Sequence, residues 1–236
     1  MTDPIAARTR PIAIAHRAGN QLDRLRAAEA VGVDYVETDV WLHRGRLEIR
    51  HEKTAGPLPV LWERWHLTPG WTPRFELAEL LQSALPETVF LLDLKGINRR
   101  LPAVLVETLA EYAPGRPFAV CSQNWDLVDA IRDHPNATAF YSVGKPWQLR
   151  RLAARLDRVG RHAVSIKSSL LDAATVRAIK ERASAVVPWR VRTPAQAQQL
   201  LDWGVDGINA DDLALLRDVM NDLRVPLSAR HRATLS

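Results

Sequence analysis

The feature that most constrains the fold is a regular alternation between short apolar runs and longer runs with helical periodicity. Short apolar runs flanked by polar segments are typical of strands buried on both faces. Eight such runs are predicted to be strands, at residues 12–16, 33–40, 88–94, 118–121, 138–142, 163–167, 185–189 and 207–209. A helix is expected after each of them, at residues 21–31, 75–84, 99–112, 125–133, 147–159, 173–182, 194–203 and 212–220.

Strands that alternate with helices form parallel sheets through right-handed crossovers. Eight units in a chain of 236 residues predict an α/β fold, a closed (β/α)8 TIM barrel in a single domain spanning residues 12–220. An open doubly wound sheet is the alternative, but it usually carries a glycine-rich loop after its first strand, and this chain has none there. Residues 1–11 are expected to be an N-terminal extension, and the basic tail 221–236 to be peripheral or disordered.

Two segments depart from the alternation. Residues 41–51 are expected to form a hairpin that turns at Arg44 and Gly45. Residues 53–74 are rich in proline and tryptophan and are expected to be an irregular loop over one face, a candidate lid or substrate wall.

Composition excludes several classes of protein. Hydrophobic residues make up 47% and charged residues 25%, as in ordinary globular proteins. No apolar run approaches the ~18 residues of a membrane helix, so no stable membrane anchor is expected. The one cysteine cannot form an internal disulfide, and the first residues do not resemble a secretory signal, so a cytoplasmic location is expected. The net charge of +5 comes from scattered arginines, which favours a solvated surface over a nucleic-acid partner and weakly suits an anionic substrate.

Polar side chains recur where the expected strands end. In such barrels the active site lies at the carboxyl ends of the strands, and burying charged groups there without purpose is costly. The residues in question follow or end six of the strands and are His16, Arg17, Glu37, Asp39, Asp93, Lys95, Lys167, Trp189, Asn209 and Asp211.

Three of these residues are candidate metal ligands. Glu37 and Asp39 are two apart in a strand and therefore share a face, where their charges repel unless a cation lies between them. Asp93, on the neighbouring strand, could supply a third oxygen. Carboxylates without cysteine favour Mg²⁺ or Ca²⁺ over zinc. The alternative is a structural ion pair with Arg17 or Lys95.

The remaining candidates suit acid–base chemistry and anion binding. His16 and His51 are predicted to be the general acid and base because histidine titrates near neutrality. Arg17, Lys95 and Lys167 are candidate ligands for phosphate oxygens. Lys167 could instead be a residue of the barrel rim that packs its aliphatic chain on the protein and extends its charged end into solvent. Trp189 is expected either to contact an organic group of the substrate or to pack at the rim.

Several segments together resemble one known family. They read AHRAGN at 15–20, DYVETDVWL at 34–42, RHE at 50–52, LLDLK at 91–95, SQNWDLVDAIR at 122–132 and VVPWRVRTPAQAQQLLDWGVDGINAD at 186–211. In this order they resemble the glycerophosphodiester phosphodiesterase family. The resemblance implies a (β/α)8 barrel that hydrolyses a small phosphodiester to glycerol 3-phosphate and an alcohol with a divalent cation. It also implies that His16 and His51 are the acid–base pair, that Arg17 and Lys95 bind phosphate, and that Glu37, Asp39 and Asp93 hold the metal.

The chain departs from the family pattern near the substrate. Ala18 stands where the family usually has glycine, Glu52 where it has aspartate, Asp93 where it has glutamate and Arg190 where it has threonine. The insertion after the catalytic histidine is also reduced. The resemblance therefore leaves the head group open, and a lysophospholipid, as in the related lysophospholipase D and sphingomyelinase D branch, is an alternative substrate.

Two other functions are alternative hypotheses to phosphodiester hydrolysis. One is a metal-dependent barrel enzyme that abstracts a proton beside a carboxylate, with Lys167 as base. The other is an inactive barrel that binds phosphorylated ligands. The sequence leaves open the choice between Mg²⁺ and Ca²⁺, which histidine is the acid, whether the nucleophile is water or a substrate hydroxyl, and the oligomeric state.

Overall fold

The computed structural model describes residues 10–54, 60–63, 66–69 and 74–221. Eight parallel strands of a nine-stranded sheet form a barrel, which closes because β1 pairs with both β12 and β2. This confirms the predicted (β/α)8 fold. The strands are β1 (Ile12–Ala15), β2 (Tyr35–His43), β7 (Phe90–Leu94), β8 (Phe118–Ser122), β9 (Ala137–Val143), β10 (Ala163–Lys167), β11 (Ala185–Trp189) and β12 (Gly207–Ala210).

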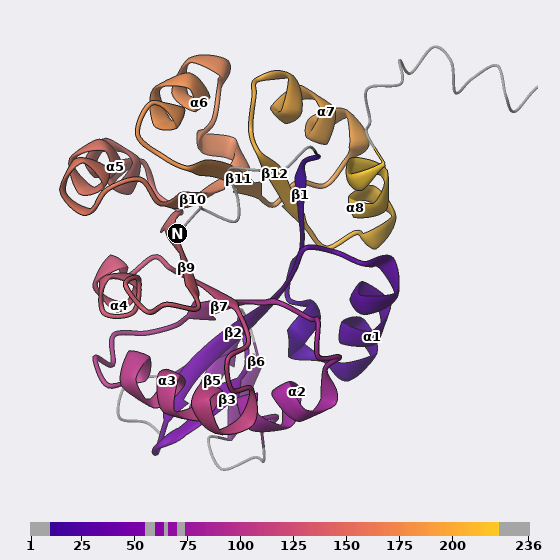
Figure 1. Cartoon of the computed structure of the whole chain (residues 1–236), viewed down its shortest axis with the longest axis vertical. Coiled ribbons are helices and arrows are strands. Elements are labelled where there is room, and N and C mark those ends of the chain that lie inside the picture. Colours follow the sequence, from indigo (N-terminus) through magenta and orange to yellow (C-terminus); the bar gives the residue numbers. More distant parts are fainter. Residues whose placement is uncertain (1–9, 55–59, 64–65, 70–73, 222–236) are drawn as a thin grey trace, which may run out of the picture.

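The described residues include eight α-helices. They surround the barrel in chain order, as the colours of Figure 1 show. Each one connects a barrel strand to the next, and α8 follows the last. None of the described helices is long and apolar enough to span a bilayer. They are α1 (Leu22–Val31), α2 (Leu77–Ser83), α3 (Leu101–Tyr112), α4 (Trp125–Asp129), α5 (Pro146–Val159), α6 (Ala173–Lys180), α7 (Pro194–Asp202) and α8 (Leu213–Met220).

The apolar core has two parts, because successive side chains of a strand point to opposite faces. One cluster fills the barrel and includes Ile12, Ile14, Leu91 and Phe140. The larger cluster lies between the sheet and the helices. Toward the carboxyl ends of the strands, the inward-facing positions are occupied by the polar residues that line the site instead of by apolar residues.

Several helices begin where short-range chemistry favours a start. The side chains of Asp172, Thr193 and Asp212 accept hydrogen bonds from backbone N–H groups in the first turns of α6, α7 and α8. Such N-caps satisfy donors that have no partner within the helix. They explain why the starts of these helices were predicted within one residue.

The predicted hairpin is present. β2 continues past the barrel and turns at Arg44 and Gly45, both with positive φ, into the antiparallel strand β3 (Arg46–Ile49). Two consecutive residues with positive φ suit the tight turn of a two-residue hairpin.

The prediction of an irregular loop at residues 53–74 was wrong for its described parts. These form a three-stranded antiparallel sheet of β4 (Lys53–Thr54), β5 (Val60–Glu63) and β6 (His66–Pro69). Pro69 is tolerated because it ends β6, which is an edge strand.

Two short 3₁₀ helices, η1 (Ala18–Asn20) and η2 (Ser168–Leu170), follow β1 and β10. Helix α4 ends at Asp129, whereas the prediction placed its end at residue 133. Ala130 caps the helix, and turns follow it. Most of the predicted extension 1–11 and of the tail 221–236 lies outside the described residues.

Candidate active site

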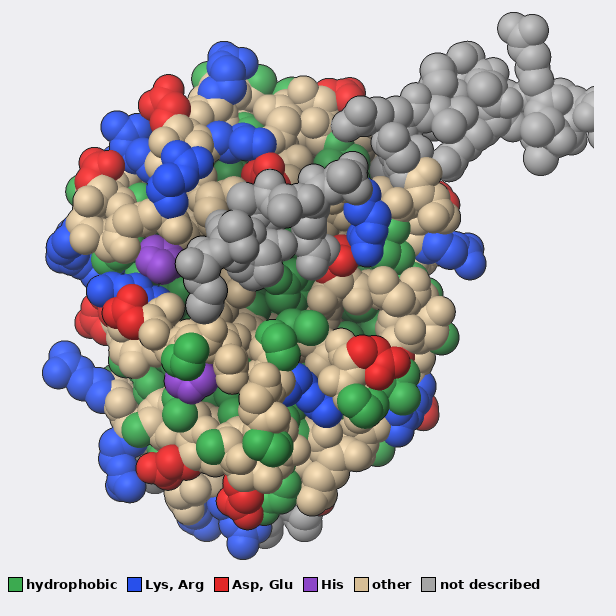
Figure 2. Space-filling model, in the orientation of Figure 1, with side chains coloured by type: hydrophobic (Ala, Val, Ile, Leu, Met, Phe, Trp, Pro, Cys, Tyr) green, Lys and Arg blue, Asp and Glu red, His purple; other side chains and the backbone are tan. Residues whose placement is uncertain are grey.

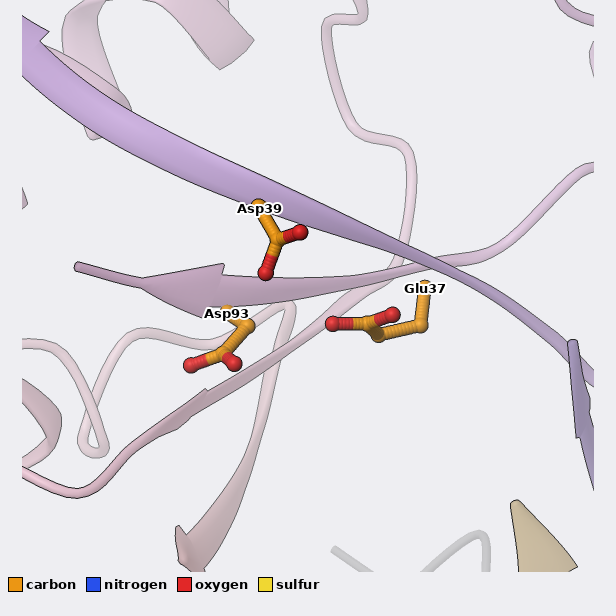
Figure 3. Close-up of side chains that lie close together, drawn as sticks. All are labelled: Glu37, Asp39 and Asp93. Atoms are coloured by element: carbon orange, nitrogen blue, oxygen red, sulfur yellow. The ribbon is translucent and has the colours of Figure 1, made fainter. Parts of the chain in front are cut away.

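Three carboxylates converge at the carboxyl ends of two neighbouring strands. Glu37 and Asp39 lie on β2, and Asp39 is in register with Asp93 on β7. One oxygen from each of the three lies within 4.8 Å of the others. Figure 3 shows the three side chains lying close together on the two strands. The spacing of two residues therefore places Glu37 and Asp39 on one face, as predicted.

Two basic residues hold this carboxylate cluster together. The Lys95 ammonium donates to Asp93 and lies 2.7 Å from an Asp39 oxygen. The Arg17 guanidinium lies 3.6 Å from Asp39, and the Arg17 backbone N–H donates to Glu37. Arg17 has a φ of 53°, a left-handed conformation that costs a non-glycine residue energy and directs this N–H to the carboxylate.

The carboxylates differ in how readily they ionise. Burial, together with the Asp39 charge, raises the pKa of Glu37 to about 7. Burial also raises the pKa of Asp93, although Lys95 opposes the rise. Burial acts on Asp39 in the same direction, but the charge and hydrogen bond of Lys95 outweigh it and lower the pKa of Asp39. Partial burial lowers the pKa of Lys95, but the charges of the surrounding carboxylates outweigh it and raise this pKa.

Asn20 fixes the position of Asp39. Its side-chain NH₂ donates to an Asp39 carboxylate oxygen at 2.8 Å, and its carbonyl accepts from the Asp39 backbone N–H and the Thr38 hydroxyl. Gly19 allows this approach, because a Cβ there would lie 2.8 Å from Thr38. The 3₁₀ turn η1 thus acts as a brace for β2.

His16 follows β1 and is paired with a carboxylate far away in the chain. Its Nδ1 lies 2.9 Å from Asp211, which follows β12. Burial lowers the pKa of His16, but the Glu37 charge and the Asp211 hydrogen bond outweigh burial, so the net pKa is raised. Arg24 also lies near Asp211, at 3.7 Å.

The carboxylates and both histidines line one cavity of about 470 Å³. His51 reaches it from the segment that follows β3. The described lining residues are His16, Arg17, Glu37, Asp39, Trp41, His51, Lys53, Asp93, Lys95, Gly96, Cys121, Gln123, Ser142, Ser165, Trp189, Arg190 and Asn209.

The lining residues from β8 to β12 carry no carboxylate. Cys121, Ser142 and Ser165 are small and buried, and burial raises the pKa of the Cys121 thiol, which disfavours its action as a nucleophile. Asn209 is 4% exposed, and its side-chain oxygen has no hydrogen-bond partner. A buried acceptor of this kind is ready for a ligand's hydroxyl group.

Arginines lie over both tryptophans of the lining. The guanidinium carbon of Arg50 is 4.5 Å from the Trp41 ring centroid, and that of Arg190 is 5.4 Å from the Trp189 ring centroid. The Trp41 and Trp189 rings, which could otherwise bind the cationic group of a ligand, therefore each already have an arginine nearby.

Of the nine predicted site residues, the structure brings eight to this cavity, and their roles stay predictions. Lys167 ends β10 and is not among the described lining residues. The predicted set omitted Asp211, Asn209, Arg190 and Asn20. Asn209 and Asp211 were among the polar residues at the strand ends but were assigned no role. The contact of Asp211 with His16 joins residues 195 positions apart, which no local pattern indicates.

The donor set fits a hard divalent cation. Three carboxylates from two rigid strands offer oxygen atoms within reach of one ion, and oxygen is the ligand atom that Mg²⁺ and Ca²⁺ prefer. Burial raises the pKa of Glu37, and the nearby charges of Asp39 and Asp93 add to the rise, so a bound cation would favour the ionised form of this carboxylate.

Comparison with known structures identified barrels of the same fold. A phosphodiesterase from Oleispira antarctica, solved with the product sn-glycerol-3-phosphate, is 22% identical with a TM-score of 0.71, over 90% of this chain and 98% of that one. A glycerophosphodiester phosphodiesterase from Parabacteroides distasonis is 20% identical with a TM-score of 0.66, over 90% and 98%. One from Thermotoga maritima is 14% identical with a TM-score of 0.67, over 86% and 96%. No curated protein matched the chain.

Comparison of the sequence with models of protein families identifies the family of this chain. The model of the glycerophosphoryl diester phosphodiesterase family matches residues 81–215, more than half of the chain. The matched region contains Asp93, Lys95 and Asp211, while the histidines and the carboxylates of β2 lie before it. The chain belongs to the glycerophosphoryl diester phosphodiesterase family and is a phosphodiesterase.

Proposed function

We propose that this phosphodiesterase hydrolyses a glycerophosphodiester to glycerol 3-phosphate and an alcohol, with a bound divalent cation and two histidines as acid and base. The observation that carries the proposal is the convergence of three carboxylates and two histidines on one cavity. The relative from Oleispira antarctica, which holds sn-glycerol-3-phosphate as its product, supports the choice of substrate.

Glu37, Asp39 and Asp93 would hold the cation, Mg²⁺ or Ca²⁺. When bound, the cation would polarise the phosphoryl group and offset the charge that builds on it. Asn20 and the backbone N–H of Arg17 keep two of these carboxylates in place. Rigid ligands of this kind lower the entropy cost of binding.

Arg17 and Lys95 would bind the non-bridging phosphate oxygens. The Arg17 side chain enters the cavity, and its buried Nε has no hydrogen-bond partner. Lys95 stays charged because its pKa is raised, and its three N–H donors exceed the two carboxylates that it contacts. Both residues therefore have donors to offer a phosphate.

His16 and His51 would move the protons. Asp211 accepts a hydrogen bond from Nδ1 of His16 when this nitrogen carries the proton, which leaves Nε2 as the atom that exchanges a proton with the substrate or the nucleophile. Such a carboxylate partner also favours the protonated ring. We assign His16 and His51 as a pair, one acting as base toward the nucleophile and the other as acid toward the leaving alcohol.

A lipid phosphodiester, as in the lysophospholipase D reaction, is the second candidate substrate. The observation that favours it is an exposed apolar side chain, Ile97, in the loop that directly follows Lys95. A proton-abstracting enzyme with Lys167 as base is disfavoured, since Lys167 is not among the described residues that line the cavity.

The proposal is tested with a panel of glycerophosphodiesters and lysophospholipids, each incubated with Mg²⁺, Ca²⁺ or chelator and followed by mass spectrometry. We expect metal-dependent release of glycerol 3-phosphate that Asp93→Asn abolishes. A matched control is Asp126→Asn, a carboxylate on α4 that does not line the cavity. Turnover that persists in chelator, or that Asp93→Asn leaves intact, would refute the proposed role of the cation.

The two histidines are distinguished by the leaving group. The nitrophenolate of a nitrophenyl diester departs without being protonated. The variant that lacks the general acid should therefore keep most of its activity on this substrate. The variant that lacks the general base should lose about 10²–10⁴-fold on both substrates. Equal losses for both variants on both substrates would contradict a division of roles.

A further inference from the structure

The exposed large apolar side chains of the described residues are concentrated at one end of the barrel. Four of the five lie in segments that follow the carboxyl ends of barrel strands, the end that carries the cavity, and they are Leu22, Leu67, Ile97 and Trp147. The fifth, Leu85, lies between α2 and β7, at the opposite end. Single exposed apolar residues are ordinary, but such a bias toward the active-site face is informative.

Two of these side chains belong to one continuous surface. Ile97 is 87% exposed in the loop after β7, and Trp147 is 49% exposed at the start of α5. The segment after β8 bridges them, because the Asn124 side chain donates to the Gly96 carbonyl and the Gln148 side chain donates to the Gln123 carbonyl. We call residues 95–100, 122–125 and 144–148 the cavity ridge.

The ridge borders the mouth of the cavity. Gly96 and Gln123 both line the cavity, and Lys95 is two residues before Ile97. Gly96 needs its positive φ of 81°, and a Cβ on it would lie 3.0 Å from the Trp41 ring. The loop that presents Ile97 is therefore held against the wall of the active site, and whatever receives Ile97 would also face the cavity.

Unpaired positive charge lies on the ridge and just beyond it on α5. Five basic side chains flank the two apolar tips and have no carboxylate partner among the described residues, namely Arg99, Arg100, Lys145, Arg150 and Arg151. The Arg151 guanidinium lies 5.5 Å from the Trp147 ring centroid. The neighbouring acid, Asp126, is already paired with Arg155.

Charge alone would not single out this surface. On the face drawn in Figure 2, basic side chains alternate with acidic ones around the molecule. What distinguishes the ridge is the combination of an aliphatic tip, an indole and unpaired cations. Tryptophan prefers the interface of a bilayer, an aliphatic side chain gains from entering it, and each nearby lysine or arginine is attracted to anionic lipids.

We propose that the cavity ridge docks on the surface of an anionic lipid bilayer, with Ile97 and Trp147 inserted among the lipids. Two tips separated by polar amides offer too little continuous apolar area for a stable protein interface. The same two tips can enter a fluid bilayer independently. That the docked cavity would then cleave a phosphodiester rests on the proposed function, whereas the docking itself does not.

The test is flotation of the full chain with phosphatidylcholine vesicles, with and without phosphatidylglycerol. We expect association that needs phosphatidylglycerol and weakens as salt rises. Ile97→Asp and Trp147→Asp should each weaken it by about tenfold or more, the cost of losing one inserted apolar side chain. Arg99→Gln should weaken it by about fivefold, since one basic residue near the membrane surface contributes about 1 kcal/mol.

Leu85→Asp is the matched control, because Leu85 is 42% exposed at the other end of the barrel. It should bind vesicles like the wild type. A second measurement does not rely on disruptive variants. An environment-sensitive dye on Ile97→Cys should shift to the blue with anionic vesicles, while the same dye on Leu85→Cys should not. The native Cys121 is buried and does not compete for labelling.

The outcomes separate docking from catalysis. Ile97→Asp should cleave a water-soluble glycerophosphodiester as fast as the wild type. Absence of vesicle binding, equal loss in Leu85→Asp, or equal dye shifts at both positions would overturn the docking proposal. Self-association of the wild type that Ile97→Asp abolishes, without vesicle binding, would also overturn it by showing a protein interface. Vesicle binding without any turnover would overturn the proposed function alone.

Discussion

Replacing Glu37 by glutamine should stabilise the metal-free protein at pH 8. The carboxyl is buried, and burial together with the Asp39 charge raises its pKa from 4.5 to about 7. A carboxyl with a raised pKa holds its proton more tightly in the folded state than in the unfolded one. Its ionisation therefore costs stability as pH rises from about 4.5 to 7, and the full cost is present above pH 7.

The size of the effect follows from the shift. At about 1.4 kcal/mol per pH unit, a rise from 4.5 to about 7 corresponds to about 3 kcal/mol. Glutamine keeps an oxygen that can accept the backbone N–H of Arg17, but it adds an NH₂ group that needs partners in a buried place. We expect a net gain of about 1–3 kcal/mol at pH 8, falling below about 1 kcal/mol at pH 5.

The assay is urea unfolding in chelator at pH 8 and at pH 5. Glu107→Gln, which removes an exposed carboxylate on α3, is the control and should change little. Added Mg²⁺ or Ca²⁺ at pH 8 should stabilise the wild type by mass action but not Glu37→Gln. If Glu37→Gln were less stable than the wild type at pH 8 in chelator, or equally stabilised at both pH values, the electrostatic reasoning would be refuted.

Three further predictions concern other parts of the molecule. Asp211→Asn should lower the pKa of His16, measured by NMR titration, and lower kcat/KM about tenfold. The free energy of unfolding should change by less than about 1 kcal/mol, because the Asp211 side chain is 67% exposed. An unchanged His16 pKa would contradict the pairing. Asn209→Leu should raise KM several-fold without loss of stability, because it removes a buried acceptor that has no partner; an unchanged KM would show that the substrate does not use this oxygen. Glu29→Gln should cost about 1–2 kcal/mol at pH 7, since the carboxylate accepts from Leu85, Thr88 and Arg26. Burial raises the pKa of Glu29, but these hydrogen bonds outweigh burial and lower it below 4.5. The difference in urea midpoint should therefore begin to shrink as pH falls below about 4.5 and disappear only below the lowered pKa of the folded state, and a difference that stays constant down to acid unfolding would refute the assignment.

Much of the barrel follows from patterns that act over a few residues. Continuous apolar runs such as 163–167 predicted strands with the right limits, because parallel strands are buried on both faces. The spacing of Glu37 and Asp39 fixed their common face, because side chains alternate along a strand. Neighbouring strands in chain order then brought Asp93 beside them.

Other features depend on contacts that no local pattern contains. The pairing of His16 with Asp211 arises only when the closing of the barrel sets β12 beside β1. The small sheet of β4, β5 and β6 was missed because prolines usually break strands, whereas here Pro69 stands at the end of an edge strand. The exposure of Ile97 could not be predicted, because nothing in the sequence tells an apolar loop residue in the core from one in solvent.

The most direct test of the central claim follows glycerophosphodiester cleavage by ³¹P NMR for the wild type, His16→Ala and His51→Ala, with saturating Mg²⁺ or Ca²⁺ and with chelator. We predict that the wild type releases glycerol 3-phosphate only with the metal ion. Each histidine variant should bind metal normally but be slower by about 10²–10⁴-fold. Turnover in chelator, or full activity in either histidine variant, would contradict the assignment of this cavity as a metal-dependent, two-histidine phosphodiesterase site.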